Sequence, residues 1–314
     1  MPEAPAFWDL PLALSGSIAE DRSSFLRVHA VPENAPSNGL HGTVLIIHGG
    51  YWKNKYGLDD EYGNAGVISL APFFLKCGFG AIEVEYRRRD HEGGGWPGTN
   101  EDILTAMRLV GGLHAAAGAS AAALQDALPA AAADAGCMAA LQKLRPDRLI
   151  LAGHSAGGCM ALWGGHRCPP NVKVAAVLAL APVADLVLGH ELRVSDEGDA
   201  VELYMKCKPD DEEGRERYAQ ASPAALLPVT FPTVVAYGDA DSHVPPELVS
   251  SYAKSASTGA PDLVREVCIP GVDHFDVVNA GSDAWKGHIV PALAALLETH
   301  LGAEVASALR QGIA

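Results

Sequence analysis

The stretch from Leu149 to Gly158 constrains the fold more than any other part of the sequence. An apolar run leads into Gly-His-Ser-Ala-Gly, and a helical pattern follows directly. Gly153 and Gly157 flank Ser155, as a sharp turn from strand to helix requires, because such a turn leaves no room for side chains. This pattern predicts a nucleophile elbow, which lifts the serine hydroxyl clear of a sheet and points the next N–H, that of Ala156, toward a developing oxyanion. The motif also arises by chance in chains with as many as 33 glycines, so an ordinary strand-to-helix turn is the alternative.

The composition is that of a soluble globular chain. With 314 residues, of which 48% are hydrophobic and 19% charged, the chain is long enough for a core covered on both faces, and we expect residues 1–314 to form a single domain. No apolar run approaches the roughly 18 residues that a membrane helix needs. The net charge of −15 argues against nucleic-acid and membrane partners, because both require clustered Lys and Arg. We therefore expect a small-molecule substrate as the partner, and the sequence leaves the oligomeric state open.

Neither the N-terminus nor the cysteines suggest secretion or metal binding. The segment from Met1 to Leu14 contains Glu3 and lacks a basic flank before a long apolar stretch, so it does not resemble a secretory signal, and we expect a cytoplasmic protein. The six cysteines are scattered and form no Cys-x-x-Cys pair and no Cys/His spacing suited to zinc. We expect buried free thiols, no metal site and no cofactor.

Apolar runs and helical patterns alternate along most of the chain. Residues 25–31 alternate loosely and end at Pro32, which predicts an antiparallel edge strand. Continuous apolar runs are typical of strands buried on both faces of a parallel sheet. Their alternation with helices predicts an α/β fold with a mostly parallel central sheet and helices on both faces. The further strands are expected at 43–47, 81–86, 149–152, 174–181, 233–237 and 263–269, and helices at 67–76, after 99–100, after Ser155 and at 284–301.

Two segments interrupt this alternation. Residues 114–144 are rich in alanine, and we interpret them as an inserted helical hairpin or a partly disordered surface excursion rather than a functional element. Residues 185–227 are acidic and helix-like, and we expect them to form a small helical cap over the site. Their run of four acidic residues at 210–213 is most simply a solvated face.

Two loops after predicted strands carry partners for the serine. A serine hydroxyl is a poor nucleophile at neutral pH, so Ser155 needs a general base and that base needs an orienting carboxylate. The loop after 233–237 contains Asp239 and Asp241, and we prefer Asp241 as the acid because Gly-x-x-Asp followed by x-x-Val-Pro is the usual form of such loops. The loop after 263–269 contains His274, the expected base. The order Ser, acid, His is that of doubly wound hydrolases.

A glycine pair follows the buried run at 43–47. His48 begins the turn, and backbone N–H groups at Gly49 and Gly50 can approach a substrate closely because neither residue has a side chain. We expect both to donate to an oxyanion together with Ala156. A plain glycine loop is the alternative.

With these residues identified, the chain resembles the α/β-hydrolases of the His-Gly-Gly esterase group from about Leu40 to its C-terminus. His-Gly-Gly-Tyr-Trp at 48–52 is similar to the His-Gly-Gly-x-Trp signature of kynurenine formamidases (arylformamidases), and the motifs at 153–157 and 272–276 resemble the elbow and histidine loops of that family. The resemblance implies an α/β-hydrolase fold and the metal-free hydrolysis of N-formyl-L-kynurenine to L-kynurenine and formate in tryptophan catabolism.

Two aromatic residues follow the glycine pair and bear on the substrate. Tyr51 and Trp52 could form a wall for an aryl substrate, and core packing for the loop is an equal alternative. Two other functions remain open beside the formamidase. The first is a general carboxylesterase acting on short acyl esters, and the second is a catalytically silent hydrolase-fold protein that binds a small ligand.

Overall fold

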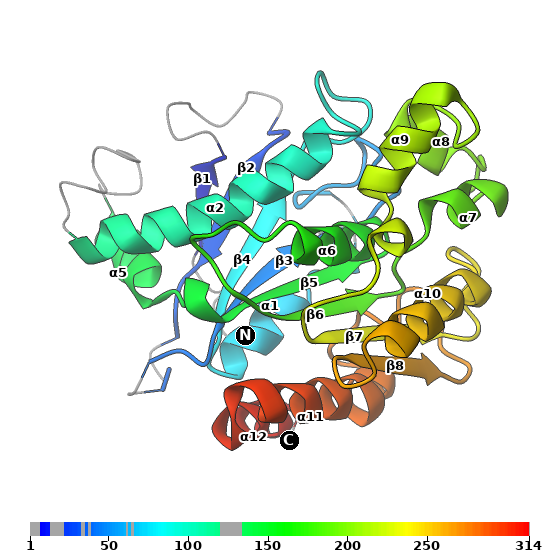
Figure 1. The fold of residues 1–314 in the computed structure, drawn as a ribbon. Coiled ribbons are helices and arrows are strands. Elements are labelled where there is room, and N and C mark those ends of the chain that lie inside the picture. Colours follow the sequence, from blue (N-terminus) through cyan, green and yellow to red (C-terminus); the bar gives the residue numbers. More distant parts are fainter. Residues whose placement is uncertain are drawn as a thin grey trace.

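The computed structural model describes residues 7–12, 22–32, 35–36, 39–60, 62–63, 66–119 and 134–313. An eight-stranded sheet runs through this part of the chain in the order β1-β2-β4-β3-β5-β6-β7-β8 (Figure 1). From β4 to β8 neighbouring strands are parallel, whereas β2 pairs antiparallel with both β1 and β4. The strands are β1 (Phe7–Pro11), β2 (Phe25–His29), β3 (Thr43–Ile47), β4 (Gly80–Glu85), β5 (Leu149–His154), β6 (Val174–Leu180), β7 (Thr233–Gly238) and β8 (Val264–Ile269).

Helices cover both faces of the sheet. Alternate residues of β3 point to opposite faces, so that Leu45 and Ile47 join one hydrophobic core and Val44 and Ile46 the other. The first core is covered by α2 (Gly98–Ala119), α5 (Ala135–Lys143), α6 (Ala156–His166) and α10 (Pro246–Gly259). The second is covered by α1 (Leu70–Lys76), the π-helical turn Trp285–Ile289, α11 (Val290–Leu301) and α12 (Ala303–Gly312), which lie below the sheet in Figure 1. The fold is that of an α/β-hydrolase, which confirms the predicted fold class.

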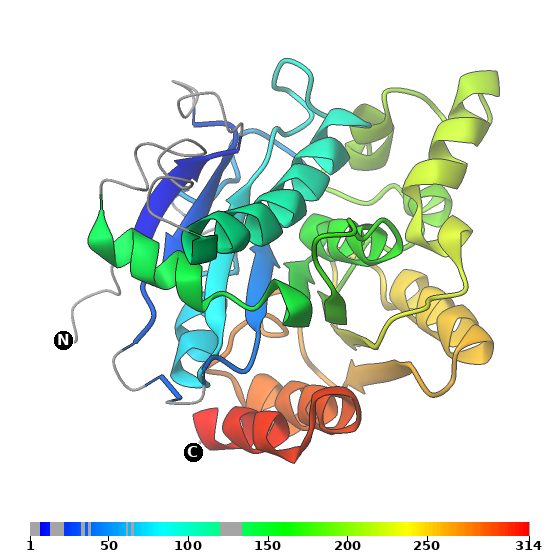
Figure 2. The same cartoon turned by 60° about the vertical axis from the view of Figure 1, so that its left-hand side comes forward.

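The antiparallel edge differs from the expectation in one respect. Residues 25–31 were expected at the edge of the sheet, but β2 lies inside it, because β1 pairs with its outer side from Phe7 opposite His29 to Pro11 opposite Phe25. Figure 2 shows β1 and β2 side by side, with α5 against them. The described ends of the alanine-rich stretch 114–144 are helical, since α2 continues to Ala119 and α5 begins at Ala135, and residues 120–133 lie outside the described part of the chain.

Three short helices follow β6 and lie on the right of Figure 1, near the carboxyl ends of the parallel strands. They are α7 (Leu186–Glu191), α8 (Ala200–Met205) and α9 (Glu212–Ala221), and a 3-10 turn, Pro223–Leu226, leads from them toward β7; another, Pro146–Arg148, precedes β5. The cap role of residues 185–227 stays a prediction.

Among the described helices, none combines the length and the apolar character that a bilayer-spanning segment needs.

Candidate active site

The turn between β5 and α6 has the sharp geometry expected of a nucleophile elbow. Ser155 adopts φ 56° and ψ −119°, a left-handed conformation that costs a non-glycine residue about 1–3 kcal/mol. A methyl group added at Gly153 would lie 2.1 Å from the carbonyl oxygen of Gly157, and one added at Gly157 would lie 2.1 Å from that of Ile47. Both flanking glycines are therefore required by close backbone approach, and the serine side chain stands at the end of β5 where α6 begins.

The acid and histidine loops meet beside this turn. Because β7 and β8 are parallel neighbours, the loops that follow them lie at the same edge of the sheet. His274 Nδ1 lies 2.7 Å from Asp241 Oδ2, and Asp241 Oδ1 accepts hydrogen bonds from the backbone N–H groups of His243 (2.8 Å) and Val244 (2.9 Å). A carboxylate only accepts, so Nδ1 carries the proton and Nε2 of His274 keeps a lone pair. That nitrogen is the one a general base would use.

The two candidate carboxylates have different surroundings. Burial alone would raise the pKa of Asp241, but the hydrogen bond from His274, its positive charge when protonated and the two backbone N–H groups together bring the pKa below its usual value. Asp239 is exposed, and its Oδ1 accepts a 2.6 Å hydrogen bond from the N–H of Gly271, which ties the two loops together. The structure thus brings Asp241, and not Asp239, to His274.

The glycine turn after β3 packs directly against the elbow. A methyl group added at Gly49 would lie 2.9 Å from the carbonyl oxygen of His154 and 3.1 Å from Cβ of Ser155. Gly50 has φ +94°, a conformation that glycine adopts readily. Among the described residues, none accepts a hydrogen bond from the backbone N–H of Gly50 or of Ala156. These N–H groups have the free donor capacity that an oxyanion site needs, whereas their catalytic role stays a prediction.

A buried polar network supports the glycine turn from below. His48 stacks on Tyr86 with ring centroids 4.3 Å apart, and its Nε2 lies 3.1 Å from Glu85 Oε1. The hydroxyl of Tyr86 donates to the carbonyl oxygen of His48 at 2.9 Å. Arg88 pairs with Glu85 at 3.2 Å and donates to the carbonyl oxygen of Tyr56 at 2.8 Å. These contacts fix the backbone of the turn, so that its N–H groups are held in place before any ligand arrives.

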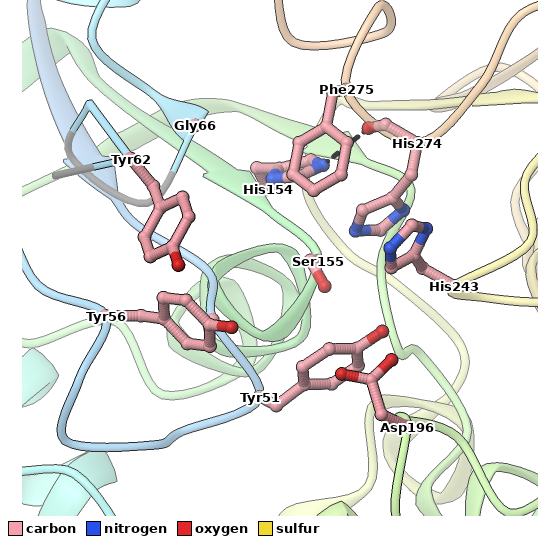
Figure 3. A pocket seen from close by; sticks show the side chains of 11 residues that line it. Tyr51, Tyr56, Tyr62, Gly66, His154, Ser155, Asp196, His243, His274 and Phe275 are labelled. Atoms are coloured by element: carbon pink, nitrogen blue, oxygen red, sulfur yellow. Dashed lines mark hydrogen bonds between the residues drawn. The ribbon is translucent and has the colours of Figure 1, made fainter.

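A cavity of about 280 Å³ opens beside Ser155 (Figure 3). Hydroxyl groups of three tyrosines point toward its centre, and the rings of His243 and His274 stack at 5.0 Å along one side. Its wall consists of Gly50, Tyr51, Tyr56, Tyr62, Gly66, His154, Ser155, Asp196, His243, His274 and Phe275.

The sequence from residue 129 to residue 303, more than half of the chain, matches the model of the prolyl oligopeptidase family, peptidase S9. The chain belongs to the prolyl oligopeptidase family. It is therefore an α/β-hydrolase of the serine hydrolase type. The narrower resemblance to kynurenine formamidases stays a prediction. No curated protein matches the sequence.

Solved structures of esterases share the fold of this prolyl oligopeptidase family member at low sequence identity. Esterase B from Lactobacillus Rhamnosis (HN001) is 16% identical to this chain, with a TM-score of 0.66. The match covers 99% of this chain and 88% of the esterase chain. A truncated carbohydrate esterase from gut microbiota is 17% identical, with a TM-score of 0.65, and the match covers 98% of this chain and 99% of that chain. The chain spans only 35% of the bifunctional GH43-CE protein of Bacteroides eggerthii, which covers 85% of this chain at 16% identity and a TM-score of 0.60.

The two aromatic residues after the glycine pair have different places in this family member. Tyr51 lines the cavity, as a substrate wall requires. Trp52 does not line it: its side chain is 0% exposed and stacks on Tyr204 of α8 with ring centroids 4.2 Å apart and an angle of 6° between the rings. The expectation of a substrate contact is therefore corrected for Trp52, which packs the turn against the 185–227 segment. Both residues have positive φ, 53° and 56°.

A Trp52→Ala variant is expected to be destabilised by about 3–5 kcal/mol, because the substitution removes a fully buried ring and leaves a cavity. Urea unfolding followed by circular dichroism measures the change. Tyr62→Ala serves as the control, because that ring is 58% exposed and its loss should cost little stability. A loss below about 1 kcal/mol at Trp52 would contradict the buried position.

His154, next to the serine, has a positioning contact that its sequence position left open. Its Nε2 donates to the carbonyl oxygen of His274 at 2.8 Å, and the two rings lie 4.4 Å apart. Burial lowers the pKa of His154 to about 3, aided by the nearby His274, so this imidazole stays neutral near pH 7. His154 thereby holds the backbone of the histidine loop without adding charge to the site.

The site residues expected from the sequence did not include seven residues of the cavity wall, namely Tyr56, Tyr62, Gly66, His154, Asp196, His243 and Phe275. Three tyrosines within the short stretch 51–62, directly after a candidate oxyanion turn, were an available signal for an aromatic wall. Phe275 directly follows His274, the expected base, so its position next to the site was a signal available in the sequence. Asp196 had no local signal, because an acidic residue in an acidic segment resembles a solvated surface residue.

Proposed function

We propose that the chain is a serine hydrolase that cleaves small carboxylic esters or formamides through a covalent acyl-serine. The observation that supports this most is the cluster at one edge of the sheet: a strained serine in the wall of a cavity that is also lined by a histidine whose Nδ1 lies 2.7 Å from a buried carboxylate. The cavity of about 280 Å³ suits a small substrate. Solved esterases of the same fold make ester hydrolysis the first chemistry to test.

In the proposed mechanism, Oγ of Ser155 attacks the carbonyl carbon while Nε2 of His274 takes the hydroxyl proton. Asp241 keeps the proton of His274 on Nδ1 and stabilises the imidazolium that forms. The N–H groups of Gly49, Gly50 and Ala156 bind the negative oxygen, and each such donor typically contributes about 3 kcal/mol. His274 then returns its proton to the leaving alcohol or amine. Water attacks the acyl-serine by the same route in reverse and releases the acid.

A second candidate substrate is an aryl formamide, with N-formyl-L-kynurenine as the specific case. The aromatic wall supports it, because Tyr51, Tyr56, Tyr62 and Phe275 surround the cavity next to Ser155 and offer ring faces and edges to an aryl group. A formyl group is also the smallest acyl group, which fits a cavity of limited volume. The carboxylesterase and the formamidase share every catalytic residue, so only substrate comparison separates them.

A substrate panel with active-site labelling tests these alternatives. We expect a fluorophosphonate to label the wild type and not Ser155→Ala, and p-nitrophenyl acetate to be hydrolysed by the wild type alone. A kcat/KM for N-formyl-L-kynurenine at least about tenfold above that for the acetate ester supports the formamidase, and the reverse supports the esterase. A prolyl p-nitroanilide tests the activity for which the family is named. Absence of both labelling and turnover would leave a ligand-binding protein and overturn the proposal.

A further inference from the structure

One carboxylate in the cavity wall has no role in the proposed mechanism. Asp196 lies in the turn between α7 and α8, within the acidic 185–227 segment, and lines the cavity. Figure 3 shows its carboxylate beside the hydroxyl of Tyr51, pointing into the same space as the hydroxyl of Ser155. Its charge helps to raise the pKa of Tyr51, whose shift is mainly caused by burial. The site therefore contains a negative group close to where a substrate would lie.

The neighbouring carboxylates are neutralised, whereas Asp196 is not. Glu197 forms an ion pair with Lys53, and Asp199 lies 3.6 Å from Arg89. Within the described ranges, no Lys, Arg or His side chain lies at ion-pair distance from Asp196. Arg193 lines an adjoining cavity that also includes Asp196, but the two form no ion pair. Of the three carboxylates in this turn, the one that faces the cavity is thus the one that lacks a cation.

Aromatic rings surround the space in front of this carboxylate. Tyr51, Tyr56, Tyr62 and Phe275 line the cavity, and Tyr62 (58%) and Phe275 (52%) are also largely exposed. The electron-rich face of an aromatic ring attracts a cation within about 6 Å. One ring of the cavity wall already has such a contact, since Nζ of Lys55 lies 4.8 Å from the centre of the Tyr56 ring.

The nearby lysines leave the charge of the cavity negative. Nζ of Lys53 lies 5.6 Å from the centre of the Tyr51 ring, but its charge is matched by Glu197. Lys55 and Asp196 are both exposed, so water and salt screen both charges. Neither lysine lines the cavity. An incoming cation therefore meets one unpaired carboxylate and several ring faces.

On this basis, and resting on the proposed hydrolase function, we propose that the cavity selects substrates that carry a protonated amino or quaternary ammonium group. Asp196 supplies the countercharge and the rings of Tyr51, Tyr62 and Phe275 supply the cation–π surface, while the scissile carbonyl lies at Ser155. A carboxylate with aromatic rings can also bind the hydroxyl groups of a neutral sugar. The charge favours the cation, because a cation gains Coulomb attraction to Asp196 at this exposed site and a neutral polyol does not.

The test compares ligands that differ only in charge. Choline and 3,3-dimethylbutan-1-ol have the same shape, and we expect calorimetry with the full-length wild type to show at least about tenfold tighter binding of choline. The same preference is expected in kcat/KM for acetylcholine over 3,3-dimethylbutyl acetate, and it should weaken with added salt. In Asp196→Asn the preference should fall to the level that the rings alone supply, about two- to fivefold. Asp210→Asn removes one charge from an exposed site of the same segment and should keep the preference.

The outcomes separate the two proposals. Equal affinity for choline and the neutral alcohol, or a choline preference that is undiminished in Asp196→Asn, overturns the cation site even if both esters are hydrolysed. Tighter binding of methyl glucoside than of choline, lost in Asp196→Asn, also overturns it and assigns the wall to a polyol. Choline preference that depends on Asp196, in a protein that hydrolyses no panel ester and takes no fluorophosphonate label, supports the cation site while overturning the hydrolase function.

Discussion

Ser155→Ala is expected to lower kcat on any ester that the wild type hydrolyses by about 10⁴-fold or more, since no covalent intermediate can form without Oγ. The protein should still fold normally. Alanine and serine both carry a Cβ, so both have the same strain at φ 56°, and the thermal midpoint should change little. Initial rates under saturating substrate and thermal unfolding by calorimetry measure the two quantities.

Ser155→Gly provides the matched control for the strain. Glycine adopts left-handed backbone conformations without a steric cost, so this variant should be as inactive as Ser155→Ala but more stable than the wild type. The opposite responses of activity and stability at one position are characteristic of a strained functional residue. Residual turnover above about one hundredth of the wild-type rate in both variants would assign the nucleophile to another residue.

The elbow was predictable from the sequence because its constraints are local. Gly153 and Gly157 are required by backbone atoms within a few residues or in the neighbouring strand, and the apolar strand before them is a continuous pattern. The parallel strands were predictable for the same reason, since strands buried on both faces consist almost entirely of apolar residues. The structure brings Asp241 and His274 together because each follows such a strand.

What the sequence could not predict depends on contacts between distant segments. β1 has only five residues and ends at Pro11, so its pairing with β2 has little local signature. The edge position of β2 was predicted from the loose alternation of residues 25–31 and from Pro32. The burial of Trp52 depends on Tyr204, which is more than 150 residues away in the chain. Asp196 likewise reaches the cavity only through the path of the segment between β6 and β7.

The acidic composition has a more specific meaning in the structure than in the sequence. From the sequence, the net charge of −15 served to argue against nucleic-acid and membrane partners. In the structure, the carboxylates of the turn before α8 differ in function, because Glu197 and Asp199 are paired with cations and Asp196 faces the cavity alone. Charge distribution around the site therefore carries information about the ligand that net charge does not.

Asp241→Asn is expected to lower kcat by about 10⁴-fold near neutral pH. The amide can present its NH₂ group to His274, and it then favours the tautomer with the proton on Nε2, which cannot accept the proton of Ser155. Asp239→Asn is the matched control. Asp239 contacts the N–H of Gly271 and lies away from His274, so its amide variant should keep the rate within about threefold.

Asp241→Asn should also change how the stability of the protein depends on pH. The pKa of Asp241 is lower in the folded protein than its usual value. Its ionisation therefore contributes stability above the unfolded-state pKa of about 4, and this contribution is lost as the pH falls through the folded-state pKa. An asparagine does not titrate. Urea unfolding of Asp241→Asn should therefore show a shallower loss of stability at acidic pH than the wild type, while Asp239→Asn should follow the wild-type curve. If Asp239→Asn were instead as inactive as Asp241→Asn, and Asp241→Asn kept the wild-type pH dependence, the assignment of Asp241 as the orienting carboxylate would be wrong.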